Sequence, residues 1–200
     1  LNTHSHGDHI GGHARIKKLA NLKVAAHISS APKVENPVPY AIETRTKFPE
    51  HSPAPQSYLQ GVPVDRVLED GEVIAGRLQV IHTPGHDDDC VCWYDLKTKT
   101  LITGDSLQGN GTPAQGIGFY KDLEGYLASV RKLQKMPIEH MICGHEYDEI
   151  GWNICGAENV RNALRICLES SGKYHDFIWQ KHRCGISDPV EIATDLIRTH

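Results

Sequence analysis

Metal-binding side chains are concentrated at residues 3–9, whose sequence is THSHGDH. Four of the six positions from 4 to 9 carry a histidine or an aspartate, which core packing does not explain. In an extended segment, residues two apart point the same way, so His4 and His6 can both reach one metal ion. Asp8 and His9 are neighbours that diverge unless the chain turns, and Gly7 makes a turn easy. Asp8 and His9 could therefore serve a second ion.

Three further candidate ligands lie far along the chain: His86 in TPGH, Asp105 in GDS and His145 in CGHEY. Each comes directly after a predicted strand, and each has a glycine beside it. Because open α/β sheets place their sites at the carboxyl ends of strands, the three loops can converge on one edge of a sheet. Imidazole and carboxylate ligands without thiolate suit zinc, iron or manganese.

The elements that must position these residues alternate between strand and helix, which predicts an α/β architecture. Apolar periodicity predicts strands at 22–27, 62–68, 72–74, 78–82, 90–94, 100–103 and 138–143. It predicts helices at 10–20, 122–136, 157–168 and 189–197, the last of them capped by Asp188. Residues 30–63 contain 7 of the 11 prolines, so we predict an irregular loop beside the active site there.

Composition excludes several classes of protein. An apolar fraction of 39% with a net charge of −4 excludes a disordered chain. The acidic balance, without a long basic run, argues against nucleic-acid binding. No apolar run approaches the roughly 18 residues of a membrane span, and the N-terminus carries no signal-peptide pattern. The six cysteines form no C-x-x-C pair, so we predict free thiols in a reducing cytoplasm.

Taken together, the segment HSHGDH at 4–9, followed by His86, Asp105 and His145, resembles the ligand set of the metallo-β-lactamase superfamily. The order and the local contexts match over residues 1 to about 150. The resemblance implies an αββα sandwich of two β-sheets flanked by helices, with two metal ions at one edge. It assigns His4, His6 and His86 to the first ion and Asp8, His9 and His145 to the second, with Asp105 bridging them.

Members of this superfamily carry several strands before the histidine motif, whereas only three residues precede His4. We therefore expect a metallo-β-lactamase-like catalytic domain at 1–150 that lacks its N-terminal strands. Residues 151–200 are predicted to be a helical extension that covers the site or packs on a second subunit. A homodimer through these C-terminal helices is the oligomer we expect.

Two close cations lower the pKa of bound water to about 7 and can hold a hydroxide between them. The resemblance thus implies a dinuclear hydrolase, with two zinc ions or with iron or manganese, acting on a small ester, thioester, lactone or amide. Asp8 and Asp105 are the predicted catalytic residues, because a carboxylate there could carry the proton to the leaving group. The alternatives are an iron-dependent redox enzyme of the same superfamily, or a truncated and inactive chain that keeps the ligands. A phosphodiesterase or nuclease is disfavoured by the acidic balance.

The stretch CGHEY at 143–147 is similar to that of hydroxyacylglutathione hydrolases, the thioesterase branch of the superfamily. In that branch the tyrosine contacts the thiol carrier, which makes Tyr147 a candidate substrate-binding residue. The alternative is an ordinary surface aromatic. Residues 107–111 diverge from the branch, and the tail carries no basic pair that matches a glutathione carboxylate site. A general small-molecule hydrolase is therefore the prediction.

The segment Asp87-Asp88-Asp89 departs from the small hydroxyl residue that commonly follows this histidine in the superfamily. Two interpretations remain open. These carboxylates could hold a histidine in place beside the metal site. They could instead form a solvated turn that leads into the strand at 90–94.

Overall fold

A computed structural model describes residues 1–47, 59–114 and 116–199 of the chain. Its helices are α1 (Gly7–Ile10), α2 (His13–Ala20), α3 (Ala31–Glu35), α4 (Val38–Lys47), α5 (Leu123–Gln134), α6 (Ala157–Arg183) and α7 (Pro189–Thr199). Its strands are β1 (Ala25–His27), β2 (Arg66–Leu68), β3 (Val73–Ile74), β4 (Leu78–His82), β5 (Val91–Asp95), β6 (Thr100–Gly104), β7 (His140–Tyr147) and β8 (Gly151–Cys155).

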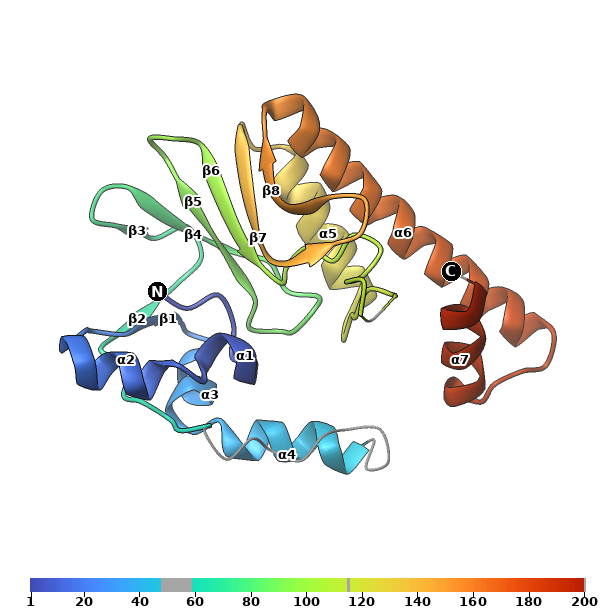
Figure 1. Ribbon diagram of the computed structural model, residues 1–200, viewed down its shortest axis with the longest axis horizontal. Helices are drawn as coiled ribbons and strands as arrows, with labels where there is room; N and C mark the ends of the chain where they lie inside the picture. Colours follow the sequence, from blue (N-terminus) through green and yellow to red (C-terminus); the bar gives the residue numbers. More distant parts are fainter. Residues whose placement is uncertain (48–58, 115, 200) are drawn as a thin grey trace.

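The elements are arranged as helices, sheet, sheet and helices, which is the layering that the resemblance implies (Figure 1). A six-stranded sheet runs in the order β3-β4-β5-β6-β7-β8, with α5 and α6 on one side. The strands β1 and β2 form a parallel pair near the other side, together with α1, α2 and α3. No helix within the described residues is long and apolar enough to cross a membrane.

The strands β6 and β7 form the one parallel pair of the six-stranded sheet that the described residues contain. The helix α5 connects them, as a crossover between parallel strands requires. The carboxyl ends of β6 and β7 therefore lie at the same edge of the sheet. Asp105 follows β6, and His145 lies in the last, irregular part of β7, two residues further along than the predicted strand end.

Apolar side chains pack against both faces of the six-stranded sheet. Along β6 and β7, Leu101 and Met141 are fully buried under α5 and α6. The next residue of each strand, Ile102 and Ile142, points to the opposite face and is 38% and 37% exposed. In β5 all five residues are buried, because α5 and α6 cover one face and the β1–β2 layer covers the other.

The prediction of an irregular loop over residues 30–63 is wrong for its first half, where the chain forms α3 and α4. Pro32 and Pro39 are the second residues of these two helices, where the proline nitrogen would have no intrahelical partner in any case. Residues 48–58 lie outside the described part of the chain. Residues 59–65 contain no helix or strand, so the strand predicted at 62–68 shortens to β2.

Other elements also differ from the sequence prediction. The helix predicted at 10–20 is divided into α1 and α2 at Gly11-Gly12. The strand β8 was not predicted, and α6 extends to Arg183, well beyond the predicted end at residue 168. Asp188 does cap α7, since its Oδ1 accepts a hydrogen bond from the backbone N–H of Val190 at 3.0 Å.

The predicted domain boundary at residue 150 falls between two paired strands. The strand β8 pairs with β7, so residues 151–155 belong to the six-stranded sheet. The first half of α6 adds Val160, Leu164 and Cys167 to the main core. Only the second half of α6 and α7 extend away from the sheet (Figure 1). The division into two domains stays a prediction.

Candidate metal centre

The segment that carries the histidine motif is held between the two sheets. The backbone N–H of Asn2 donates to the carbonyl of Ala25 in β1 at 3.2 Å. The backbone N–H of Val91 in β5 donates to the carbonyl of Thr3 at 2.8 Å. The indole N–H of Trp93 also donates to the carbonyl of Asn2 at 3.0 Å. These bonds fix the extended backbone that presents His4 and His6 side by side.

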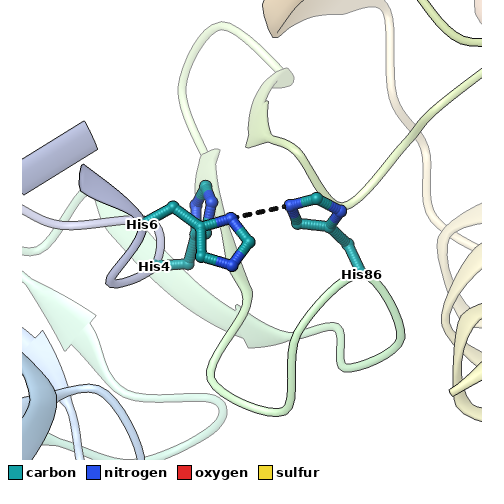
Figure 2. A group of neighbouring side chains, drawn as sticks. All are labelled: His4, His6 and His86. Atoms are coloured by element: carbon teal, nitrogen blue, oxygen red, sulfur yellow. Dashed lines mark hydrogen bonds between the residues drawn. The ribbon is translucent and has the colours of Figure 1, made fainter. Parts of the chain in front are cut away.

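The structure brings together His4, His6 and His86 in a first cluster (Figure 2). One ring nitrogen of each lies within 4.8 Å of the others. The shortest distance, 3.0 Å, joins Nδ1 of His6 and Nε2 of His86. His4 is fully buried, and its Nε2 has no hydrogen-bond partner within the described part of the chain. The three nitrogens converge as ligands of one cation would.

The other ring nitrogen of His4 and of His86 contacts a fixed polar atom. Nδ1 of His4 lies 3.3 Å from the hydroxyl of Thr3. Nδ1 of His86 lies 2.9 Å from the backbone carbonyl of Phe119. A bond from Nδ1–H to that carbonyl leaves the lone pair of His86 on Nε2, which faces the cluster.

A second cluster contains Asp8, His9, Asp105 and His145, whose ligand atoms lie within 4.8 Å of one another. Oδ2 of Asp8 is 3.2 Å from Nε2 of His145 and 3.5 Å from Nε2 of His9. The side chains of Asp8 and His145 are 55% and 39% exposed. This cluster therefore opens to solvent at Asp8 and His145, whereas in the first cluster His4 and His86 are buried and His6 borders the surface.

Asp105 lies between the two clusters. Its Oδ2 is 3.2 Å from Nε2 of His145, 3.6 Å from Nε2 of His86 and 4.0 Å from Nε2 of His4. Its Oδ1 is 3.3 Å from Nε2 of His9. The carboxylate thus reaches nitrogens of both clusters, which is the placement that a bridging ligand needs.

Two glycines permit the close approach around Asp105. A Cβ at Gly144 would lie 2.3 Å from Oδ1 of Asp105 and 3.0 Å from a ring carbon of His9. A Cβ at Gly104 would lie 2.6 Å from Cβ of Thr3, and Gly104 has a φ of +50°. Only a residue without a side chain fits either position, which explains the glycine beside these two ligands.

Burial and neighbouring charges set the protonation of the histidines. Burial, with the nearby His6, lowers the pKa of His86 from 6.5 to about 4. Burial also lowers the pKa of His4 well below its usual range. In the second cluster, burial opposes charge on His9, but attraction to the carboxylate of Asp105, 3.3 Å away, outweighs it and raises the pKa of His9. His4 and His86 are consequently neutral imidazoles at neutral pH.

Asp105 is held ionised in the same way. Its burial raises the pKa, but the close contact with His9 and the charges of His9 and His4 lower it by more, so the net shift is downward. Nε2 of His4, Nε2 of His9 and Oδ1 of Asp105 are buried atoms without hydrogen-bond partners in the described part of the chain. Such a group of orphaned ligand atoms is unfavourable unless a cation satisfies it. The residues present therefore fit a pair of cations, and their nitrogen and oxygen donors suit zinc, iron or manganese alike.

A cleft of about 850 Å³ opens beside His6. The apolar part of its lining includes Tyr40, Leu59 and Phe119. The charged part includes Lys33 and Lys121. Its volume lies within the range of small-molecule sites.

Tyr147 is buried, with 1% of its surface exposed, so the alternative of a surface aromatic is wrong. Its ring faces His145, and its hydroxyl lies 3.2 Å from Nε2 of Gln108. The predicted contact of Tyr147 with substrate stays a prediction, and the packing gives this tyrosine a structural position beneath the second cluster.

Gln108, which is not among the residues predicted from the sequence, ties three loops together. Its Nε2 donates to the backbone carbonyl of Asp105 at 2.8 Å, and its Oε1 accepts from the backbone N–H of Phe119 at 3.2 Å. With the contact to Tyr147, this buried amide joins the loops after β6, before α5 and at the end of β7. A single glutamine in a glycine-rich segment carries no sequence signal for such a role.

Comparison with known proteins assigns the family. A profile of the Metallo-beta-lactamase superfamily matches residues 1–145, so the chain belongs to this superfamily. The hydroxyacylglutathione hydrolase of Rhodopseudomonas palustris (strain BisB5) is 28% identical over 170 residues, which are 83% of this chain and 52% of the relative. The chain thus spans about half the length of the curated relatives it matches.

Two solved structures confirm the predicted fold class. The protein TTHA1623, in a di-iron-bound form, is 27% identical with a TM-score of 0.54 over 80% of this chain and 72% of its own. The metallo-beta-lactamase family protein TTHA1429 from Thermus thermophilus has a TM-score of 0.62 at 22% identity, over 89% of this chain and 62% of its own. The latter likeness concerns the fold alone.

Proposed function

We propose that this chain is a dinuclear metal-dependent hydrolase that acts on a small ester, thioester, lactone or amide. The observation that carries the proposal is the convergence of two ligand clusters on the single carboxylate of Asp105, beside a cleft. The similarity to hydroxyacylglutathione hydrolases supports a hydrolytic reaction and makes thioesters the first substrates to test.

The protein would hold the first ion with His4, His6 and His86 and the second with Asp8, His9 and His145, with Asp105 shared. Two bound cations at such a site supply Lewis acidity, an acidified water and stabilisation of the developing negative charge. Asp105, ionised and buried, offsets part of the cationic charge. Asp8 has an exposed carboxylate at the edge of the second cluster, so it can exchange a proton with solvent and deliver it to a leaving group.

The substrate is proposed to be a small molecule bound in the cleft beside His6. Its apolar part would lie against Tyr40, Leu59 and Phe119, which line that cleft. We further propose a cytoplasmic protein, in keeping with six cysteines that are all free thiols. Neither nucleic acid nor membrane is a proposed partner. The homodimer through the C-terminal helices stays a prediction, which light scattering of the purified protein tests.

A second candidate function is an iron-dependent redox reaction. It is favoured by one observation, the di-iron-bound form of the similar protein TTHA1623. The same residues suit iron as well as zinc. Metal analysis after purification without added metal separates the two, because two zinc ions per chain with no iron would exclude the redox reaction.

The experiment that tests the hydrolase is a screen of thioester, lactone, β-lactam and phosphodiester probes with metal-loaded protein. We expect hydrolysis of at least one ester-class probe, and its loss in Asp105→Ala. The matched control is Asp176→Asn, an exposed position on α6. Protein that holds two metal equivalents and hydrolyses none of these probes would refute the proposal.

A further inference from the structure

Asp87 is a buried carboxylate beside the first cluster. It follows His86 directly and is 3% exposed, so the interpretation of residues 87–89 as a solvated turn is wrong for this residue. Its Oδ2 lies 2.9 Å from Nε2 of His6 and 2.5 Å from Nζ of Lys121. Its Oδ1 lies 3.3 Å from Nζ of Lys33 and accepts from the backbone N–H of Asp88 at 2.8 Å. Both oxygens are therefore fixed.

We propose that Asp87 is a positioning residue that sets the tautomer and the ring orientation of His6, with Lys33 and Lys121 as its two anchors. The inference rests on the proposed metal-binding role of His6. The inference assigns a role to Asp87, which stands where the superfamily commonly has a small hydroxyl residue. It also assigns a role to Lys33 and Lys121.

The tautomer of His6 follows from the one donor and the one acceptor of a neutral imidazole. An imidazole ring has one N–H and one lone pair, and a carboxylate oxygen can only accept. The contact with Asp87 therefore places the proton of His6 on Nε2. The lone pair is then on Nδ1, which is the atom that faces Nε2 of His86 at 3.0 Å. A carboxylate behind a metal-binding histidine also raises the basicity of that ligand.

The two anchors come from different parts of the fold. Lys33 lies on α3 and is itself buried, with contacts to Asp87, Asp88 and Asp89. Lys121 lies just before α5 and is partly exposed. Because one lysine contacts each oxygen of Asp87, the carboxylate cannot rotate without breaking an ion pair. Through Asp87, the ring of His6 is thereby linked to two lysines that line the cleft.

His6 is the member of the first cluster that most needs this support. His4 is fully buried and His86 is 5% exposed, so packing already restricts their rings. The side chain of His6 is 31% exposed and borders the cleft. A ring at the edge of a cavity has room to turn, and the contact with Asp87 removes that freedom.

The test compares Asp87→Asn with Asp88→Asn. An amide cannot replace both oxygens of Asp87: its NH₂ group must either face His6 or face Lys33 and a backbone N–H. The first arrangement favours the wrong tautomer of His6, and the second breaks an anchor. Asp88 has an exposed side chain that contacts Lys33 and lies outside the contact between Asp87 and the ring of His6, so its variant removes the same charge nearby.

Two measurements are made on each variant. Competition with a chelator gives the zinc affinity of the first cluster, and ¹⁵N NMR of the metal-free protein gives the tautomer of His6. For Asp87→Asn we expect an affinity lower by about 10- to 100-fold and a loss of the Nε2–H tautomer. For Asp88→Asn we expect less than about a twofold change in affinity and an unchanged tautomer.

Unchanged zinc affinity with an unchanged tautomer in Asp87→Asn would overturn the inference. If that variant does not fold, Lys121→Met keeps Asp87 and His6 and removes one anchor at a partly exposed position. We expect it to weaken zinc binding by less than about tenfold, in the same direction; no change in it would also count against the inference. Wild-type protein that shows the Nε2–H tautomer but binds no metal would support the positioning role and refute the proposed function instead.

Discussion

The two ligand clusters differ in how much of their geometry the fold sets in advance. The first is made of imidazoles alone, two of which are buried, and has each ring held from behind by a hydroxyl, a carboxylate or a carbonyl. The second contains carboxylates, and the side chains of Asp8 and His145 are 55% and 39% exposed. One half of the site is therefore preorganised, while Asp8 and His145 in the other half are more exposed to solvent.

This difference has a consequence for the order of metal binding. Preorganised ligands lose little freedom when a cation binds, so the first cluster is expected to bind its ion more tightly. Exposed ligands exchange more readily with water. Asp105 belongs to the second cluster but also reaches nitrogens of the first, so a substitution there is expected to affect both.

The largest effect is expected for Asp105→Ala, which removes the carboxylate that reaches both clusters. Turnover is expected to fall by at least about 10³-fold, since the shared ligand and its charge are lost together. Elemental analysis should show fewer than two metal ions per chain. Full metal content in this variant would contradict the bridging role, and Asp176→Asn serves as the control for handling and folding.

A pair of alanine variants separates the clusters. His4→Ala is expected to abolish the tighter of two binding phases, and His145→Ala only the weaker one. Loss of the buried direct ligand His4 should weaken binding at the first site by more than about 100-fold, since loss of a ligand's hydrogen-bond partner alone costs about 10- to 100-fold. Titration of metal-free protein with zinc against a chelator measures both phases. Identical titration curves for the two variants would show that the clusters are not distinct.

Acid should destabilise the metal-free first cluster. The pKa of His86 is about 4 in the folded chain, against an ordinary value of 6.5, so the unfolded chain binds more protons between these values. The free energy of unfolding must then fall as the pH decreases through that window. From pH 6.5 to pH 5, His86 alone contributes about 2 kcal/mol of this loss.

Urea denaturation in the presence of a chelator measures this loss, with His86→Gln as the matched variant. The variant should lose less stability between pH 6.5 and pH 5 than the wild type does. His9 works in the opposite direction, because its pKa is raised and its contribution to stability disappears as the pH rises through that value. An equal pH dependence in both proteins would show that His86 does not stay neutral in the fold.

The smallest effect is expected for Tyr147→Phe. The variant keeps the buried ring and removes a hydroxyl that contacts Gln108. Loss of that contact should lower the free energy of unfolding by about 1 kcal/mol. Zinc affinity at the first cluster should not change. An altered KM for a thioester probe with unchanged stability would instead favour the predicted role of Tyr147 in substrate binding.

The candidate ligands could be recognised from the sequence because local rules place them. The motif at 4–9 packs several ligands into one short segment, and Asp105 lies at the end of a clear strand. The sheet was also largely predictable, since β4, β5 and β6 show apolar patterns that agree with the observed strands. The ligand motif and the strand patterns depend on residues that are close together in the sequence.

The features that the sequence did not reveal depend on distant contacts. Lys33 meets Asp87 across 54 positions of the chain, and no local pattern connects them. The density of prolines at 30–63 argues against the helices α3 and α4, but Pro32 and Pro39 lie in first turns, where proline is compatible with a helix. The strand β8 is short and carries Gly151 and Asn153, so pairing with β7 rather than strand propensity defines it.

The cleft is built largely from segments that supply no candidate ligand. Tyr40 comes from α4 and Leu59 from the chain that precedes β2. Phe119 holds Nδ1 of His86 through its backbone carbonyl, which every residue at this position would offer, while its ring packs edge-on against that histidine. Side chains at these three positions can therefore be exchanged without removing any of the seven donor groups. Mutational libraries confined to Tyr40, Leu59 and Phe119 are therefore expected to change the selectivity that we propose for this cleft, while all the candidate metal ligands stay in place.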